Sequence, residues 1–282
     1  MSTAGQIVLR GGARRRVVRG VLFILALVYV GVLLLAPTLG ILFSVVREGW
    51  ELVSRTFSQA DVQNSFKLTA TTTLITVVVT AFFGVITAWV LARDHFPGRS
   101  LLNAFVDLPM AVSPVIVGLM AVLLFGRGGW FEPFFAARGI QIIFAVPSMV
   151  IVTIFISIPF VIREVLPVLQ EIGTDEEEAA KTLGASALQS FFRVTLPNIR
   201  WALFYGIALS AARAIGEIGA VLIVSGSIQG LNETATMFIF RALEERQDAQ
   251  AYIVALTLAA LSILLLVAIE FFKHRQKKEI SR

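Results

Sequence analysis

Long segments without a charged residue are the feature that most constrains the fold of this chain. Residues 20–46 and residues 68–92 form uncharged, mainly apolar runs of 27 and 25 positions. A transmembrane helix needs about 20 such residues, so each run is long enough to cross a bilayer. Four more runs are long enough, one of them interrupted by two charges: residues 108–126, 139–162, 201–232 and 249–269. The sequence therefore predicts an all-α membrane protein with six transmembrane helices within residues 20–272.

The composition agrees with a membrane protein and excludes several chemistries. Hydrophobic residues make up 57% of the 282 positions and charged residues 15%, against about 45–50% and 25% in soluble domains. There is no cysteine, and the two histidines, His95 and His274, lie far apart. Neither a metal site nor a Ser-His-Asp catalytic set is therefore expected.

The chain also has no G-x-x-x-x-G-K-[ST] loop for binding nucleotide phosphates. It is therefore not expected to be an enzyme or to bind a cofactor itself. If its function depends on ATP and Mg²⁺, a partner protein has to bind them.

The basic residues predict the orientation of the chain. With both termini in the cytoplasm, the cytoplasmic segments hold 16 Lys and Arg, whereas the opposite segments hold 7. Cytoplasmic loops of membrane proteins are enriched in these residues. Residues 1–19 and 273–282 are therefore expected to be basic cytoplasmic tails that fix the orientation and bind no nucleic acid. The first apolar run is too long for the core of a signal peptide, so it is expected to remain as a helix.

Residues 163–200 form the longest predicted cytoplasmic segment, and its pattern indicates two short helices. Thr174 and Glu177 have the spacing of a capping box at the start of the first helix. Acidic residues at this point also favour a helix N-terminus. Gly184 is placed to adopt the left-handed conformation that ends a helix.

A second short helix is expected after this glycine. Its apolar face follows the three- and four-residue spacing of a helix and consists of Leu188, Phe191, Phe192 and Thr195. Leu196-Pro197 is expected to end the helix, because proline cannot continue the hydrogen-bond ladder. Two short helices held at the cytoplasmic face have the shape of a plug for a groove in a partner protein.

The same segment resembles the EAA signature of ABC importer permease subunits. The matching residues are Glu178-Ala179-Ala180, then Gly184 after a gap of three, then Val194-Thr195-Leu196-Pro197 after a gap of nine. Val194 stands where isoleucine is commoner. The resemblance implies that residues 163–200 are a coupling loop that docks on ATPase subunits. The residues expected to carry the coupling are Thr174, Glu177, Glu178, Ala179, Ala180, Gly184, Leu188, Phe191, Leu196 and Pro197. The alternative is an amphipathic loop lying on the membrane surface.

Other segments are similar to sulfate and molybdate permeases, namely residues 108–118, 212–220 and 225–228. Within that group, residues 162–165, 173–177 and 200–201 resemble the CysW-type subunits of sulfate/thiosulfate importers. Residues 232–237 depart from the usual pattern of the family, in a loop that would face a binding protein.

This resemblance implies a subunit that forms half of the membrane pathway of an ABC importer in a bacterial inner (plasma) membrane. Its expected partners are a related second permease subunit, two ATPase subunits, an extracytoplasmic sulfate-binding protein and the surrounding lipid. Molybdate or tungstate is the alternative cargo. A secondary transporter or channel that needs no ATPase is the alternative class, which an inverted repeat of spans would favour; no such repeat is visible in the sequence.

Two charges interrupt the fifth predicted span. Arg213 and Glu217 are four residues apart, and therefore on one helix face. Because a charge inside a bilayer is costly, they are expected either to form an ion pair that fixes packing or to line a translocation pathway. A pathway for a dianion should offer hydroxyls, helix N-termini and a partly neutralised arginine. The candidates are Ser113, Pro114, Arg213, Glu217, Ser225 and Ser227, with a proline kink that serves packing alone as the alternative at Pro114.

Glycines within the predicted spans are expected to allow close helix contact and to bind nothing. They are Gly118, Gly206, Gly216 and Gly219.

Overall fold

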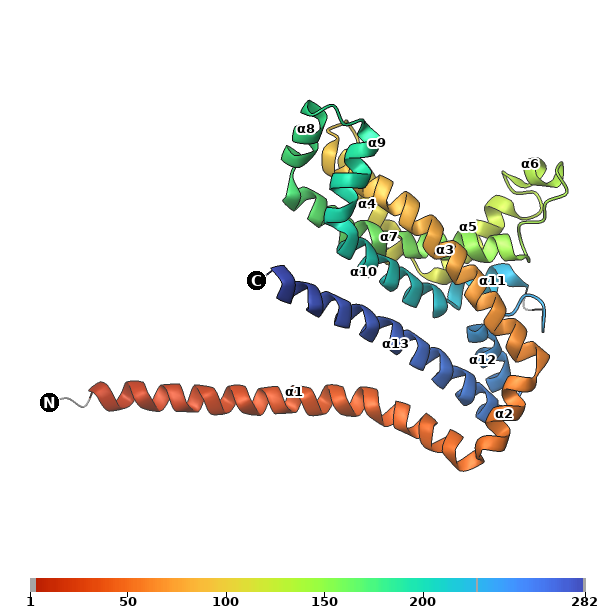
Figure 1. Ribbon diagram of the computed structural model, residues 1–282. Helices are drawn as coiled ribbons and strands as arrows, with labels where there is room; N and C mark the ends of the chain where they lie inside the picture. Colours follow the sequence, from red (N-terminus) through yellow and green to blue (C-terminus); the bar gives the residue numbers. More distant parts are fainter. Residues whose placement is uncertain (1–3, 227, 281–282) are drawn as a thin grey trace.

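A computed structural model describes residues 4–226 and 228–280, with side chains described for residues 18–33, 35–226 and 228–267. Every regular element in these ranges is helical (Figure 1), which confirms the expected all-α class. In chain order the elements are α1 (Ala4–Glu48), α2 (Trp50–Ser58), α3 (Ala60–Arg93), α4 (Arg99–Ala111), α5 (Pro114–Phe125), α6 (Glu132–Ala136), α7 (Val146–Ile172), α8 (Asp175–Thr182), α9 (Ala187–Ser190), the π-helical η1 (Phe191–Thr195), α10 (Leu196–Ile215), α11 (Gly219–Ser225), α12 (Ala235–Glu244) and α13 (Asp248–Ile280).

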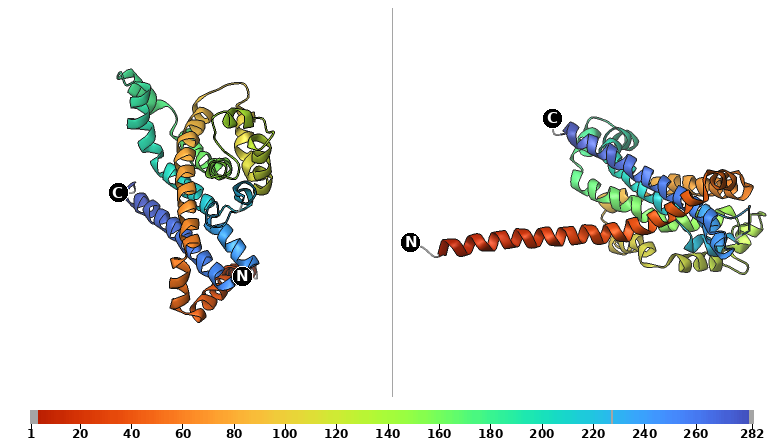
Figure 2. Two further views of the ribbon diagram at one scale, coloured as in Figure 1. Left: turned by 90° about the vertical axis from the view of Figure 1, so that its right-hand side faces the viewer. Right: turned by 90° about the horizontal axis from the view of Figure 1, so that it is seen from below.

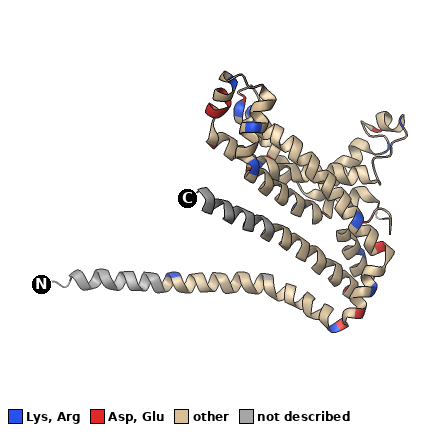
Figure 3. Ribbon diagram, viewed as in Figure 1, with Lys and Arg blue, Asp and Glu red and all other residues tan. Residues whose placement is uncertain are grey.

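The helices are arranged so that the molecule has two polar ends. The start of α1, the end of α13 and the pair α8–α9 lie at one end, here called the loop end (Figures 1 and 2). Helices α2, α6 and α12 lie at the opposite end, here called the far end. Among the side chains that the structure describes, charges concentrate at these two ends and are sparse between them (Figure 3).

Four helical segments among the described residues are long and apolar enough to cross a membrane. They are Val18–Glu48, Ala60–Arg93, Val146–Ile172 and Asp248–Val267. Two bent helix pairs raise the possible number of spans to six, if each pair counts as one span. The chain is thus a multi-pass membrane protein by its helix lengths and composition, and the expected number of six is the upper limit.

The third and fifth predicted spans are broken, which corrects the expectation of simple helices. Helices α4 and α5 are bent by 111° at residues 112–113, and the α9–α10 helix and α11 are bent by 56° at residues 216–218. The first break precedes Pro114, whose ring disfavours helical backbone in the residue before it. The second break contains Gly216, which ends α10 as its C-cap. The second break falls near the middle of its predicted span, residues 201–232, whereas the first falls in the first third of residues 108–126.

The helices on both sides of the predicted coupling loop continue into its range of residues 163–200. Helix α7 starts at Val146 and continues to Ile172. Arg163 and Glu164 are unfavourable in lipid, but charged residues of this kind do not interrupt a helix. At the other side, Pro197 does not end a helix as expected. It lies in the first turn of α10, directly after η1, and the chain stays helical from Ala187 to Ile215. The Leu196 amide bonds to the Phe191 carbonyl in the wider π pattern, and the missing N–H of proline falls where this pattern returns to the α pattern.

Helices α3, α7 and α10 form the packed centre of the molecule. Val161 of α7 is fully buried between glycines of its two neighbours. A Cβ atom on Gly84 would lie 2.8 Å from Val161 Cβ, and one on Gly206 would lie 2.9 Å from Val161 Cα. Both distances are below van der Waals contact, so glycine is required at each position. The expected close contact at Gly206 is confirmed, as is that at Gly118, where a Cβ would lie 2.8 Å from the Ala220 carbonyl oxygen.

Candidate functional site

The first helix of the coupling loop begins as the sequence predicts, but by a different cap. Helix α8 starts after Thr174 and carries four consecutive acidic residues in its first turn, where the helix dipole favours negative charge. Thr174 does not cap a backbone N–H; its hydroxyl donates to Glu178 Oε1 at 2.9 Å. The predicted capping box of Thr174 and Glu177 is therefore wrong, because the Glu177 carboxylate has other partners.

Glu177 is turned into the protein and only 7% exposed. Its Oε1 atom accepts a hydrogen bond from Arg93 Nη2 at 2.9 Å and another from Thr195 Oγ1 at 2.9 Å. The same arginine donates through Nη1 to the Leu169 carbonyl at 2.8 Å. One carboxylate thus ties α8 to the end of α3 and to η1, and Arg93 extends the network to α7. Since a buried charge is tolerated only when it is paired, the position of α8 depends on this contact.

Two further contacts hold the second half of the coupling loop. Phe191 stacks on Trp89 of α3, with ring centroids 4.9 Å apart and ring planes 11° from parallel. Asn198 Nδ2 donates to Glu176 Oε2 at 2.6 Å, which joins the first turn of α10 to that of α8. Phe191 was expected to contact an ATPase, but the structure places it against α3 and leaves it half-buried.

The turn between the two short helices contains Gly184 with φ of +86°, which confirms the left-handed conformation expected there. The next helix starts with a complete capping box that sequence reasoning missed. Gln189 N donates to Ser186 Oγ at 3.3 Å, and Ser186 N donates to Gln189 Oε1 at 2.9 Å. The signal was present in the sequence as the S-x-x-Q spacing.

The coupling loop presents an apolar tip on either side of this turn. Leu183 is 89% exposed, Leu188 is 71% exposed and Phe192 is 59% exposed. Of the ten predicted coupling residues, the exposed ones are Glu178, Ala179, Gly184, Leu188 and Pro197, the half-buried ones are Thr174, Ala180, Phe191 and Leu196, and the buried one is Glu177. The coupling loop is thus held by buried contacts and presents an exposed apolar surface with the Glu178 carboxylate nearby. Such a surface suits docking on a groove of another protein.

The two broken spans meet each other inside the helical bundle. A Cβ atom on Gly219, the first residue of α11, would lie 3.0 Å from Pro114 Cβ, at the start of α5. The expected close contact at Gly219 is thereby confirmed. Ser113 is the N-cap position of α5; its side chain is exposed and caps no backbone N–H. We call this contact between the two breaks the helix-break junction.

Arg213 and Glu217 form the expected ion pair at this junction, with Arg213 Nη1 lying 2.6 Å from Glu217 Oε2. Glu217 is 3% exposed, and its other oxygen accepts from the Ala220 amide at 2.7 Å. The carboxylate therefore caps the N-terminus of α11 as well. The arginine side chain keeps 29% of its surface exposed. The expected ion pair is thus present, and the pair leaves part of the arginine accessible.

The remaining pathway candidates and glycines are placed differently. Ser225 is fully buried at the C-terminal end of α11, and its Oγ contacts the sulfur of Met237 at 3.3 Å. It is therefore not on the surface of this chain. Ser227 lies outside the described residues. Gly216 contacts only its own helix, so the expectation of close packing there is wrong. Among the residues that the structure describes, no group of three or more His, Cys, Asp or Glu could hold a metal ion.

Comparison with known proteins defines the family. Residues 81–278 match the family described as Binding-protein-dependent transport system inner membrane component. This chain belongs to that family, so it is a membrane component of a transport system and not an enzyme in its own right. Membership decides against the alternative of a secondary transporter or channel.

Relatives with sulfate in their names share much of the sequence. A protein named Sulfate transport system permease protein CysW, from Synechocystis sp., is 46% identical over 92% of this chain and 94% of its own length. A protein of the same name from Escherichia coli is 44% identical over 86% of this chain and 81% of its own length. The E. coli protein named Sulfate transport system permease protein CysT is 35% identical over 89% of this chain and 90% of its own length.

Two solved structures share the fold at low identity. A chain of a bacterial ABC transporter involved in the import of alginate matches with a TM-score of 0.77 and 16% identity, over 95% of this chain and 98% of the other. A chain of the bacterial alginate ABC transporter in complex with its alginate pentasaccharide-bound periplasmic protein matches with a TM-score of 0.79 and 17% identity, over the same shares.

Proposed function

We propose that this chain is one of two transmembrane subunits of an ABC importer that takes up sulfate or thiosulfate across a bacterial inner membrane. The observation that carries the cargo assignment is the 46% identity to a sulfate permease over nearly the whole chain. Both a CysW and a CysT protein of E. coli are similar to it, which supports a related sister chain as the second permease subunit. A solved relative in complex with a periplasmic protein supports a binding protein as a further partner.

In this proposal two ATPase subunits bind ATP and Mg²⁺ and dock at the loop end of the two permeases. The exposed tip of Leu183, Leu188 and Phe192 supports this role, because apolar side chains on a rigid mount are the usual core of a protein interface. The loop end is then cytoplasmic, as are both termini and their basic tails. The far end, with α2, α6 and α12, faces the binding protein.

We further propose that the translocation pathway passes the helix-break junction. Ser113 supports this, because it is exposed and occupies the N-cap position of α5, and helix N-termini favour anions. Arg213 is partly neutralised by Glu217 at 2.6 Å, so it attracts a dianion without holding it tightly. Broken helices at the middle of a membrane serve the same purpose in other transporters. The pathway would be completed by the second permease.

The decisive experiment is transport by the purified complex in proteoliposomes. The vesicles contain this chain, its sister permease and the ATPase, with the ATPase facing the lumen and the binding protein outside. They should accumulate radiolabelled sulfate when ATP is enclosed in the lumen. Molybdate in excess should compete weakly. If molybdate-loaded binding protein raised ATPase activity while sulfate-loaded protein left it unchanged, the cargo would be molybdate or tungstate and the sulfate assignment would be wrong.

A further inference from the structure

Helix α3 extends from one end of the molecule to the other without interruption. It runs from Ala60 to Arg93, 34 residues, or about 50 Å at the rise of an α-helix. Its two neighbours in the packed centre are less regular, since α7 contains Pro159 and Pro167 and α10 is preceded by the π-helical segment. Helix α3 contains no proline, so it lacks the local break in hydrogen bonding that proline introduces.

At the loop end, Arg93 is the last residue of this helix and joins it to the coupling loop. The Arg93 and Glu177 side chains are only 10% and 9% exposed, and the arginine also holds the Leu169 carbonyl. A planar guanidinium can bind two acceptors at fixed angles, which an ammonium cannot do. Movement of α8 therefore reaches α3 directly through this side chain.

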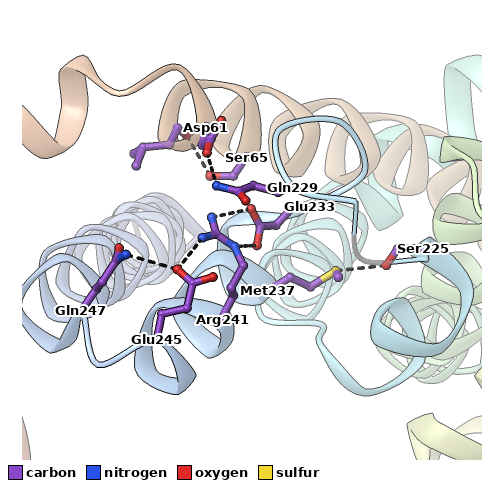
Figure 4. Close-up of polar contacts among 10 residues, drawn as sticks. Asp61, Ser65, Ser225, Gln229, Glu233, Met237, Arg241, Glu245 and Gln247 are labelled. Atoms are coloured by element: carbon purple, nitrogen blue, oxygen red, sulfur yellow. Dashed lines mark hydrogen bonds and ion pairs between the residues drawn. The ribbon is translucent and has the colours of Figure 1, made fainter.

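At the far end, the first turns of α3 hold the loop between α11 and α12. Asp61 Oδ2 accepts from Gln229 Nε2 at 2.7 Å (Figure 4). Asn64 Nδ2 donates to the Gly230 carbonyl at 3.2 Å, and the Ala235 amide donates to Thr69 Oγ1 at 2.8 Å. Two adjacent residues of the loop and the first residue of α12 are thus fixed to one helix.

The same loop is made rigid on its other side by a charged cluster. Arg241 donates to both oxygens of Glu233, through Nε at 2.7 Å and Nη2 at 3.0 Å, and also to Glu245 at 3.1 Å (Figure 4). The hydrogen bonds to Glu233 raise the pKa of Arg241, so the guanidinium stays protonated. The contacts to α3 on one side and to Arg241 of α12 on the other thus hold this end of the loop at two helices.

In the middle, α3 is locked to its neighbours by a hydroxyl pair and a glycine. Thr80 and Ser210 of α10 share a hydrogen bond of 3.0 Å, and Gly84 is in close contact with Val161. These contacts lie one turn apart, so α3 does not slide past its neighbours. Helices α3, α7 and α10 would then move together. The polar contacts of α3 at the loop end and at the far end would move with them.

We infer that α3 connects the ATPase side to the binding-protein side, and that Arg93 is the positioning residue that joins α3 to the coupling loop. This inference rests on the proposed function, because it assumes an ATPase at the loop end and a binding protein at the far end. Coupling of two sites through one element acts in both directions. Docking of the loaded binding protein at the far end and ATP binding at the loop end therefore favour each other through this helix, and the resulting shift in population raises ATPase activity.

The test measures the ratio of ATPase activity with and without loaded binding protein, in the complete complex in proteoliposomes. Arg93→Gln removes the positive charge and the guanidinium group that binds two acceptors. In this variant the ratio should fall about fivefold or more, a typical coupling factor. Arg93→Lys should restore part of the ratio, since it keeps the charge toward Glu177 but cannot also hold Leu169 O. A role in folding alone would change the yield of complex and leave this ratio as it was.

A matched control and a second variant make the test specific to α3. Arg163→Gln removes another ion pair, in which Arg163 of α7 binds Asp107 of α4 through two bonds of 2.7 and 2.6 Å. It should leave the ratio within about twofold, because these partners lie in α4 and not in α8 or η1. Asp61→Asn weakens the far-end attachment and should lower the ratio. Combined with Arg93→Gln it should lower the ratio no further, because both changes interrupt one connection.

An unchanged ratio in Arg93→Gln, or independent losses that multiply in the double variant, would overturn the inference. If Arg93→Gln does not assemble, Asp61→Asn decides instead, and a ratio equal to that of the unchanged protein overturns it. Failure of the proposed function looks different, since the unchanged complex would then show no stimulation by the sulfate-loaded binding protein. The ratio should in that case be measured with whichever loaded binding protein stimulates the unchanged complex.

Discussion

The coupling loop and the helix-break junction are held in place by different means. The loop depends on side chains, since one buried carboxylate, Glu177, and one stacked ring, Phe191, fix it to the helices below. The junction has a buried carboxylate of its own, Glu217, which caps α11, but it also needs glycine at two positions, since Gly118 and Gly219 let α5 and α11 come into close contact. The difference indicates that the loop can be released by loss of one contact, whereas the contact between α5 and α11 is disturbed by added volume. Four variants test this comparison.

Glu177→Ala should have the largest effect. It leaves the Arg93 guanidinium buried without its partner, and breaking a buried pair in this way costs about 3–5 kcal/mol. The expected result is a subunit that inserts in the membrane but loses its ATPase during purification and transports nothing. Quantification of ATPase in the affinity-purified complex checks this. Normal retention of the ATPase would show that the loop is fixed by its other contacts.

Gly118→Val should come next and should act on the junction alone. The new Cβ would lie 2.8 Å from both Ala220 O and Ile223 Cβ, and overpacking of this kind costs about 1–3 kcal/mol. Transport should fall while the ATPase remains bound. Gly216→Ala is the matched control, because its Cβ has no neighbour closer than 3.6 Å and should leave transport near normal. Loss of ATPase in Gly118→Val would contradict the separation of the two regions.

Gly184→Val should weaken the loop by a smaller amount. A β-branched residue at φ of +86° costs about 1–2 kcal/mol. Since no atom of this chain lies within 4 Å of the new Cβ, any loss beyond this cost must come from the docked ATPase. Gly184→Asn serves as the control, because asparagine tolerates left-handed backbone. The measurements are the thermal unfolding midpoint of the subunit and ATPase retention. Equal retention in both variants would show that no partner packs against this turn.

Glu178→Ala should have the smallest effect on the stability of the loop. The carboxylate is exposed in the first turn of α8, where such a charge contributes about 0.3–1 kcal/mol. The thermal midpoint should therefore be almost unchanged, in contrast to Glu177→Ala. A large decrease in ATPase retention with an unchanged midpoint would show that Glu178 contacts the ATPase directly. Comparison of Glu177→Ala with Glu178→Ala thus distinguishes a residue that holds the coupling loop on this chain from one that contacts the ATPase.

The sequence predicted the features that depend on local pattern. Hydropathy and length located the spans, and glycine at position 184 predicted a left-handed turn, because both signals lie within a short stretch of chain. The ion pair of Arg213 and Glu217 was predictable for the same reason, as its members are four residues apart.

The features that escaped prediction depend on residues far apart in the chain or on backbone that no composition reveals. The partner of Glu177 is Arg93, 84 positions away, so the sequence favoured a local capping box that does not form. The break at Gly216 lies between Arg213 and Glu217, and their four-residue spacing favoured one continuous helix through this position. The continuation of the helix through Pro197 required a π-helical turn, for which single-sequence patterns give no signal.

The isolation of α1 has a consequence for the order in which the protein is made. None of the most apolar stretch of α1 is buried by the rest of this chain. Its main neighbours are α2 and the last helix, α13. About 200 residues separate Glu48 from Asp248. At a synthesis rate of about 5–20 residues per second, α1 is inserted some 10 to 40 seconds before α13 exists. During that time it must remain stable in lipid as a single helix, which explains why its uncharged run is longer than any other in the chain.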